Sequence, residues 1–460
     1  EDWALAGWSN PLEGFYNSST SNSSNLISGL AASYRLFNGG KLKLNAGYTH
    51  LNSNELVKMP RRSYNPSSWQ NIDHASLHLQ NFQKSWILEP QFIYERKIGN
   101  LKMDALAGTT FQEREFEKVS FQGKGYVSEG LIGNLSATED ILNGSSQYTT
   151  YRYSALFGRL GINWDRKYYL NLTGRRDGSS RFGPGKQWAN FWAIGGSWIF
   201  TEEGFLDGDD AFLSFGKLRA SYGTTGNDQI GDYGYLDAYE ATPGAGGLYP
   251  TQLANSDYSW EVNKKLEAAL EFSLFKNRFE LGLSWYRNRS SNQLVGYPLP
   301  SITGFTTIQA NLPATVENTG WELEVSSRNV QSDDFHWQSS MNISFPKNEL
   351  VSYPRLDQSS YANTYRVGFP LNISLLYQYE GIDPQTGYYS VLDVNEDGSY
   401  DFEDRIVIQD WGRKFFGGIN NNLRYKNFSL QFLWQFVKQE GTFDLLNAGD
   451  IGVQGVEVMK

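Results

Sequence analysis

Hydrophobic and polar residues alternate along residues 264–287. In an extended chain, one face of the first half would carry only apolar side chains: Leu266, Ala268, Leu270, Phe272 and Leu274. The opposite face would carry the polar residues Glu267, Glu271 and Ser273. After Lys276 and Asn277 the alternation resumes with Phe279, Leu281, Leu283 and Trp285. A period of two predicts strands with one apolar face, and the short connection containing Asn predicts an antiparallel hairpin.

The same pattern recurs along the whole chain, so the prediction extends from one hairpin to the whole fold. About fifteen segments alternate in this way: 26–36, 42–49, 74–80, 86–96, 101–115, 148–164, 168–177, 189–200, 217–223, 264–274, 279–287, 316–328, 335–350, 415–425 and 428–437. Many of them have at least the roughly nine to eleven residues that a tilted strand needs to cross a bilayer. We therefore predict an all-β chain.

The connections between these strands alternate in length. Short polar turns follow every second strand, and long loops rich in Gly, Ser and Asn follow the others: 51–73, 116–147, 178–188, 224–263, 290–315 and 351–414. Outer-membrane barrels have short periplasmic turns and longer extracellular loops, and a closed barrel leaves no unpaired backbone edge in lipid. The pattern favours one large antiparallel transmembrane β-barrel over 1–460, with 116–147, 224–263, 290–315 and 351–414 as extracellular elaborations. A soluble adhesin of several β-sandwiches is the alternative fold, and extraction behaviour would separate the two.

Composition agrees with a chain of which every second residue faces lipid. Among 460 residues, 40% are apolar and 15% aromatic, with 14 Trp, 28 Tyr and 28 Phe, yet no run of 18 apolar residues predicts a transmembrane helix. Abundant aromatics are expected where girdles mark two membrane interfaces. The chain has no Cys, which excludes thiol chemistry, and its net charge of −10 argues against nucleic acid as a partner.

The two ends of the sequence carry no signal of their own. The chain opens at Glu1-Asp2-Trp3 without the basic and apolar regions of a signal peptide. Residues 457–460 do not alternate as a terminal barrel strand would. We expect the sequence to be a segment of a longer protein.

Several ordered blocks carry a family resemblance. They are RRDGSSRFG at 175–183, KLRASYG at 217–223 with Gly226 and Asn227, ENTGWE at 317–322, GIDP at 381–384, DVNEDG at 393–398 and KFFGG at 414–418. Together with the surrounding 168–200 segment, these blocks resemble the SusC/RagA family of TonB-dependent outer-membrane transporters. The likeness is specific over about 170–430 and rests on strand pattern alone before that.

The resemblance implies a barrel of 22 strands with an N-terminal plug, a segment that contacts the TonB complex, and a SusD-like surface lipoprotein as a lid. The plug, the TonB box and the last strand do not occur in this sequence. The implied function is import of a bulky nutrient, an oligosaccharide or a peptide, across the outer membrane of a Bacteroidetes-type bacterium. The alternative is a SusC-like barrel acting as a structural subunit of a larger outer-membrane assembly or secretion machine. Co-purifying partners would distinguish them.

One acidic segment has the spacing of an EF-hand calcium loop. Its candidate ligands at positions one, three, five, seven, nine and twelve are Asp393, Asn395, Asp397, Ser399, Asp401 and Asp404. Gly398 would supply the sharp turn at position six, whereas Asp404 stands where an EF-hand carries the longer Glu, and no flanking helices are predicted. Two interpretations fit: a Ca²⁺ site in loop 393–404, or a turn held by its own Asx hydrogen bonds.

Two further groups have a functional and a structural interpretation. Arg175, Arg176, Asp177 and Arg181 would suit an anion-binding site, but we favour a network of paired charges at the barrel rim. Aromatic residues in the loops would stack on sugars or meet a lid protein, and most are expected to form loop cores or girdles: Trp188, Tyr233, Tyr235, Tyr249, Tyr258, Trp260, Tyr297 and Phe305. The substrate-binding residues cannot be selected from the sequence.

No catalytic constellation is evident. The four histidines, His50, His74, His78 and His336, are scattered, and no H-E-x-x-H frame surrounds the pair at 74 and 78. The sequence contains no G-x-S-x-G elbow, no P-loop and no Cys/His zinc pattern. We predict that the protein is not an enzyme.

The connection lengths predict topology in the membrane. Loops 224–263 and 351–414 should face the cell exterior, and the turns at 276–277 and 426–427 should face the periplasm. Protease added to intact cells should cut within the loops and spare the turns, as mapped by mass spectrometry of the fragments. Cleavage at the turns and never in the loops would invert the barrel.

Overall fold

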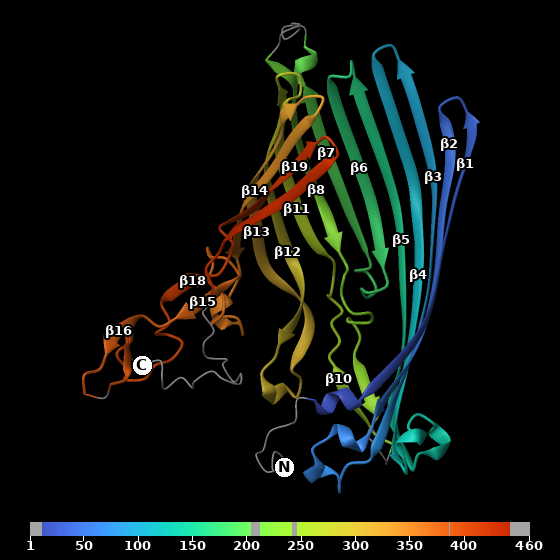
Figure 1. Ribbon diagram of the computed structural model, residues 1–460, viewed down its shortest axis with the longest axis vertical. Helices are drawn as coiled ribbons and strands as arrows, with labels where there is room; N and C mark the ends of the chain where they lie inside the picture. The colour runs from blue at the N-terminus through green and yellow to red at the C-terminus, as the bar shows by residue number, and fades with distance from the viewer. Residues whose placement is uncertain (1–11, 204–211, 242–245, 386, 442–460) are drawn as a thin grey trace.

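The computed structural model describes residues 12–203, 212–241, 246–385 and 387–441, and a single sheet of fourteen antiparallel strands dominates it (Figure 1). The strands follow chain order around the sheet: β1 (Ser18–Phe37), β2 (Gly40–Met59), β3 (His74–Ile98), β4 (Leu101–Tyr126), β5 (Asp140–Trp164), β6 (Tyr168–Ser179), β7 (Trp188–Ile199), β8 (Leu213–Asn227), β11 (Glu261–Leu274), β12 (Phe279–Pro298), β13 (Thr307–Gln331), β14 (Phe335–Ser352), β19 (Phe415–Tyr425) and β20 (Phe428–Lys438). The predicted large antiparallel all-β fold is confirmed.

Smaller elements lie in the connections. Three two-stranded sheets pair β9 (Ala238–Ala241) with β10 (Leu248–Gln252), β15 (Ile373–Leu376) with β18 (Val407–Asp410), and β16 (Tyr379–Ile382) with β17 (Tyr389–Val391). Short 3₁₀ turns complete the connections: η2 (Glu13–Tyr16), η3 (Arg61–Ser63), η4 (Pro66–Ser68), η5 (Glu129–Leu131), η6 (Leu135–Ala137), η7 (Phe200–Glu202), η8 (Ser301–Thr303) and η9 (Leu356–Gln358). Within the described ranges, none of the helical segments has the length and apolar character to cross a bilayer.

Two of the predicted segments form one strand. Segments 74–80 and 86–96 are both part of β3, and the residues between them pair without interruption, Asn81 with Ser53 of β2 and with Lys118 of β4. The run Asn81–Ser85 is too polar to show alternation, but its backbone groups are bonded on both sides. The fifteen predicted segments therefore become fourteen strands.

The strands also extend beyond the alternating segments into the stretches predicted as loops. β4 continues to Tyr126, β5 begins at Asp140, β12 continues to Pro298 and β13 begins at Thr307. Some of the added residues, such as Ser145, Ser146 and Gln147, are polar on both faces of the strand, whereas Tyr297 and Leu312 pack in a loop core. Alternation detects the part of a strand that has lipid on one side, so it misses extensions that have water or loop side chains beside them.

The sheet separates an apolar face from a polar one. Leu270 pairs with Leu218 and Leu283 in one row, and these two neighbours are 47% and 38% exposed. On the other side of the same strand, Glu271 forms ion pairs with Lys217 and Arg219. We call the face that carries Leu270 the outer face and the face that carries Glu271 the inner face. This arrangement is the one expected of a barrel in lipid.

Aromatic residues mark two levels on the outer face. In β7, Trp188 and Trp198 both point outward and are ten residues apart. Ten residues at about 3.3 Å each span about 33 Å, which a tilt of about 40° reduces to a height of roughly 25 Å. That height equals the apolar band of an outer-membrane barrel. Trp164 and Tyr168 flank Trp198, and Trp86 lies near the level of Trp188.

Most short connections lie at one end of the sheet and most long ones at the other, with the connection 200–212 between β7 and β8 as a longer member of the first set. Figure 1 shows the short turns at the top and the longer loops at the bottom, with the orange lobe of β15–β18 projecting toward the lower left. The turn after β19 has two residues, Lys426 and Asn427, as predicted. The turn after β11 is wider, 275–278, because Phe275, Lys276 and Asn277 all take positive φ angles of 52–61°. We refer to the two ends as the turn end and the loop end.

The two faces should respond oppositely to charge. Leu281→Arg places a guanidinium in lipid and should destabilise the barrel by about 2–4 kcal/mol near the bilayer midplane. Ser284→Arg should be tolerated, because it points to the inner face, where Ser284 lies beside Glu322. For each variant, a urea titration followed by gel migration measures the fraction of barrel that is folded. Normal folding of Leu281→Arg with loss of the barrel in Ser284→Arg would show that the faces are assigned inside out.

Candidate functional site

An aromatic core lies on the inner face at the loop end. Phe191 of β7 points inward and packs with Trp260, whose ring also contacts Phe182 at 5.2 Å between centroids. Tyr258 completes the buried set, and the Trp260 indole donates to the Gln187 backbone carbonyl. The residues come from β7, from the connection before it and from the connection that follows β8. This cluster holds residues 180–187 and 258–260 against the sheet.

An arginine fastens the same loops through polar contacts. The Arg181 guanidinium donates to Asp232 at 2.9 Å and to the Asp228 carbonyl at 2.8 Å, and it lies 4.3 Å from the centroid of the Tyr151 ring. The Tyr151 hydroxyl in turn donates to the Asp228 carboxylate. Arg181 and Asp232 are almost buried, with side chains 12% and 13% exposed. Breaking such a pair is costly, so the loop 228–260 has a fixed attachment to β5 and to the segment after β6.

The predicted arginine group is divided between two faces of the sheet. Arg175 lies on the inner face, where it pairs with Asp177 at 2.7 Å and donates to the Tyr153 hydroxyl. Arg176 points to the outer face, where its guanidinium lies 5.6 Å from the Trp188 ring centroid. Arg181 belongs to the loop attachment. The four residues form no common anion site, and three of them take part in the paired-charge network that we favoured.

A second core supports the loop after β14. Leu350, Val316 and Tyr353 are buried together, and Tyr297, Tyr361 and Tyr365 pack around them. The tyrosine rings contact one another at centroid distances of 5.5–6.3 Å. The cluster joins β12, β13, β14 and the segment 353–371 at the loop end.

The aromatic residues predicted in the loops lie in several different environments. Tyr258 and Trp260 are buried in the first core, Tyr235 packs against it, and Tyr297 belongs to the second core. Trp188 is on the outer face. Tyr233 and Tyr249 are exposed, although the Tyr233 hydroxyl accepts a hydrogen bond from the Thr150 backbone. Phe305 is partly buried. Most of the set is structural, as expected for loop cores and girdles.

The histidines lie in different environments. His78 stacks on Phe121 at 4.8 Å between ring centroids and forms a hydrogen bond with Ser76. His74 accepts a hydrogen bond from the Arg61 backbone. His50 packs against Phe82 in the sheet. These contacts are those of structural side chains.

The acidic loop 393–404 is closed by hydrogen bonds to its own backbone. Asp393 accepts from the Gly398 N–H, Asn395 from that of Asp397, and Asp397 from that of Ser399. Gly398 has a φ of 81°, which its lack of a Cβ permits. In the described part of the chain, no three His, Cys, Asp or Glu side chains form a group arranged to hold a metal ion. These are the bonds of a self-bonded Asx turn.

Asp404 holds the two ends of this loop together. Its side chain is fully buried, and its two oxygens accept from the Val394 and Asp401 backbone N–H groups at 2.7 and 2.9 Å. These hydrogen bonds, the one from Asp401 most strongly, lower the pKa of Asp404 below its ordinary value of 3.8. The stabilisation of the loop by the ionised Asp404 is therefore complete above about pH 4, and it is lost only as the pH falls through the lowered pKa of Asp404. The loop is closed throughout the neutral range.

One oxygen in the loop is not explained by the turn. Oδ1 of Asp393 is buried and has no hydrogen-bond donor among the described residues, whereas Oδ2 of the same carboxylate bonds Gly398. A buried acceptor without a partner is costly. In an EF-hand loop, the carboxylate at position one is a calcium ligand. Because this Oδ1 has no donor among the described residues, we retain Ca²⁺ binding by the loop as a proposal.

Sequence reasoning missed the partners that make the loop attachment. Along the chain, Tyr151 lies 30 residues before Arg181, and Asp228 and Asp232 lie 47 and 51 residues after it. Only the position of Asp228 next to the Gly226-Asn227 block gave any signal. The contacts exist because β5, β6 and β8 bring these loops to one end of the sheet.

Comparison with known proteins gives a consistent result. The model of the TonB dependent receptor-like β-barrel family matches residues 2–425. TonB-dependent receptor P26 of Formosa agariphila is 29% identical over 408 residues, which are 81% of this chain and 40% of that protein. TonB-dependent receptor SusC of Bacteroides thetaiotaomicron is 26% identical over 368 residues, which are 74% of this chain and 36% of that one. The chain thus spans about 40% of the length of the curated relatives it matches.

A solved structure supports the fold. The structure described as that of the RagAB peptide transporter covers 94% of this chain and 49% of its own, with a TM-score of 0.83 at 23% identity. At this identity the likeness concerns the fold.

The acidic loop yields a test of calcium binding. If Asp393, Asn395, Asp397, Ser399, Asp401 and Asp404 surround Ca²⁺, chelation should loosen residues 380–414 and leave the barrel folded. Asp397→Ala should reproduce this loosening, because it removes a central ligand without touching a strand of the large sheet. Hydrogen exchange of the loop, with and without millimolar Ca²⁺, is the measurement.

Glu396→Ala is the matched control, since it removes a neighbouring charge from position four, which carries no ligand in this spacing. It should keep the calcium-dependent protection. A structure determined in millimolar Ca²⁺ that shows no ion about 2.3–2.6 Å from these oxygens would leave the self-bonded turn as the explanation.

Proposed function

The chain belongs to the TonB dependent receptor-like β-barrel family, and on that premise we propose that the protein imports a bulky nutrient, an oligosaccharide or a peptide, across the outer membrane. The resemblance to SusC and RagA is confirmed, and the family consists of outer-membrane TonB-dependent receptors rather than enzymes. The substrate, the lid partner and the coupling to TonB are parts of the proposal.

The observation that carries the proposal is the chemistry of the inner face. Arg219 donates to Glu267 and Glu271, and Lys217 pairs with Glu271, on the face opposite to the outward-pointing Leu218 and Leu270. Charged side chains in a barrel strand are stable where they face a water-filled interior. A wet, charged interior is suited to a polar cargo.

The class of cargo that we propose is inferred from the names of similar proteins. The solved structure with a TM-score of 0.83 is described as a peptide transporter, and a curated relative is named SusC. Peptides and oligosaccharides both present many hydrogen-bonding groups, which a polar interior accommodates. We therefore retain both as cargo, with energy supplied through TonB.

The loop end offers a surface for a lid. The Arg181–Asp232 pair and the core around Trp260 attach residues 180–187 and the described residues 228–235 and 258–260 to the sheet. A fixed rim costs little ordering entropy when a second protein docks on it. A SusD-like surface lipoprotein is the partner that we propose for this rim.

Uptake measurements test the proposal. A strain that lacks the gene should lose periplasmic uptake of fluorescent oligosaccharides or peptides of one class, and the wild-type gene should restore it. Disrupting TonB should abolish the same uptake, because import against a gradient needs energy. Uptake of a small solute that enters through general porins should be unchanged in every strain.

Affinity purification of the tagged protein is the second readout. A single surface lipoprotein should co-purify in stoichiometric amount. Normal uptake of all cargo classes, combined with co-purification of assembly or secretion subunits, would instead show that the barrel is a scaffold.

A further inference from the structure

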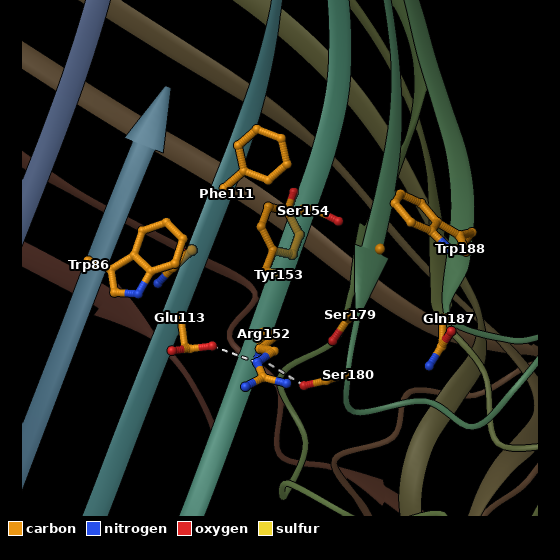
Figure 2. Close-up of a pocket in the computed structure, with 12 residues that line it drawn as sticks. Trp86, Phe111, Glu113, Arg152, Tyr153, Ser154, Ser179, Ser180, Gln187 and Trp188 are labelled. Carbon is orange, nitrogen blue, oxygen red and sulfur yellow. Dashed lines mark hydrogen bonds and ion pairs between the residues drawn. The ribbon is translucent and has the colours of Figure 1, made fainter. Parts of the chain in front are cut away.

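A pocket of about 460 Å³ opens on the outer face across β3 to β7. Its outward-facing residues follow one row of cross-strand pairs: Trp86 with Glu113, Glu113 with Arg152, and, one step on, Ser154 with Gly178 and Gly178 with Trp188. Figure 2 shows Trp86, Phe111 and Trp188 around this space, with Arg152 bonded to Glu113. The pocket is on the face that meets lipid, opposite the proposed transport path.

Its height places the pocket at the membrane boundary. Trp188 lies about 25 Å from the level of Trp198 across the apolar band, as derived above. In bacterial outer-membrane barrels the longer loops are extracellular. The loop end therefore meets the outer leaflet, and the pocket is at the level of its headgroups.

The pocket offers rings and positive charge together. Arg152 is 71% exposed and pairs with Glu113 at 2.5 Å, and the Arg176 guanidinium is held over the Trp188 ring beside the pocket. Two arginines and one glutamate leave a local charge of +1. Guanidinium groups bind phosphate through paired hydrogen bonds, and indole faces pack against the C–H faces of sugar rings. A phosphorylated sugar matches both features.

An apolar groove of about 680 Å³ lies on the same face, toward the turn end. Its residues lie on the same face as those of the pocket, an even number of positions further along each strand: Leu156 after Ser154 in β5, Thr109 and Ala107 beyond Phe111 in β4, and Pro90 beyond Trp86 in β3. The groove therefore begins where the pocket ends, and it runs through the hydrocarbon band.

Particular residues of the sequence account for the groove. Pro90 has no N–H, and the pairing of β3 with β4 skips from Leu88–Phe111 to Gln91–Gly108 around it. Ala32 and Ala107 line the same space with the smallest of side chains. A gap in pairing flanked by small residues leaves a concave apolar surface in lipid.

We propose that the pocket and the groove together bind one phosphorylated glycolipid of the outer leaflet. Its sugar packs against Trp86 and Trp188, its phosphate meets Arg152 and Arg176, and an acyl chain fills the groove. Because the groove lies at hydrocarbon depth, a soluble protein cannot reach it. The site is independent of the proposed transport function and would exist in a scaffold barrel as well.

Native mass spectrometry of the full-length protein in detergent tests the site, with a synthetic phosphorylated and acylated glucosamine disaccharide as the probe. The wild type should retain one probe molecule per barrel. Arg152→Gln combined with Arg176→Gln should lower its affinity by at least about tenfold, the effect of losing one hydrogen bond to a charged group. Ala107→Phe, which fills the groove without changing charge, should lower affinity independently.

Arg289→Gln is the matched control. Arg289 lies on the same face at a similar height and pairs with Glu317, but it lines neither the pocket nor the groove. This variant should bind like the wild type, and heat-modified migration on gels should show that all variants are folded. Equal binding by all the variants, by the probe without its phosphates, or by phosphatidylglycerol would overturn the proposal. So would displacement of the probe by a second copy of the barrel.

Discussion

Backbone hydrogen bonding in lipid is the constraint on which this structure depends. Water is absent from the hydrocarbon band, so each N–H and C=O in it must find a partner within the sheet. The chain meets this requirement between neighbouring strands of the sheet, from β1 to β20. Asn81 and its neighbours remain in β3 although their side chains are polar, because β2 and β4 bond their backbone groups on both sides. Between β3 and β4 the pairing is interrupted at Pro90, which has no N–H, and an apolar groove lies there.

Side chains have to suit two solvents once the backbone is satisfied. Neighbouring residues of one strand point to opposite faces, so Leu270 meets lipid while Glu271 pairs with Lys217 and Arg219 in water. The same rule separates Arg175 from Arg176. The first joins Asp177 on the inner face, and the second lies over Trp188 on the outer face. Two arginines that look equivalent in sequence therefore act in different environments.

The constraint relaxes at the loop end, where water reaches both faces of the strands. Connections there are free to leave the large sheet, and they are fixed by side chains as well as by small two-stranded sheets of their own. Arg181 and Asp232 attach one loop to the rim, and Asp404 closes another by accepting two backbone N–H groups. These attachments are polar and partly buried, which makes them strong and specific at the same time. The loop end is thus built on a different physical basis from the part that crosses the membrane.

The sequence by itself determined the strands that cross lipid and the two faces of each, because an apolar and a polar solvent impose a period of two on local residues. It also determined the short turn at Lys426 and Asn427 and the spacing of the acidic loop. Only the tertiary structure decided that 74–80 and 86–96 are one strand, that the strands extend into 116–126 and 307–315, and that Tyr151 and Asp232 meet Arg181. These features depend on partners many residues away or on strand ends beyond the lipid, where water or loop side chains replace lipid and the periodic signal is lost.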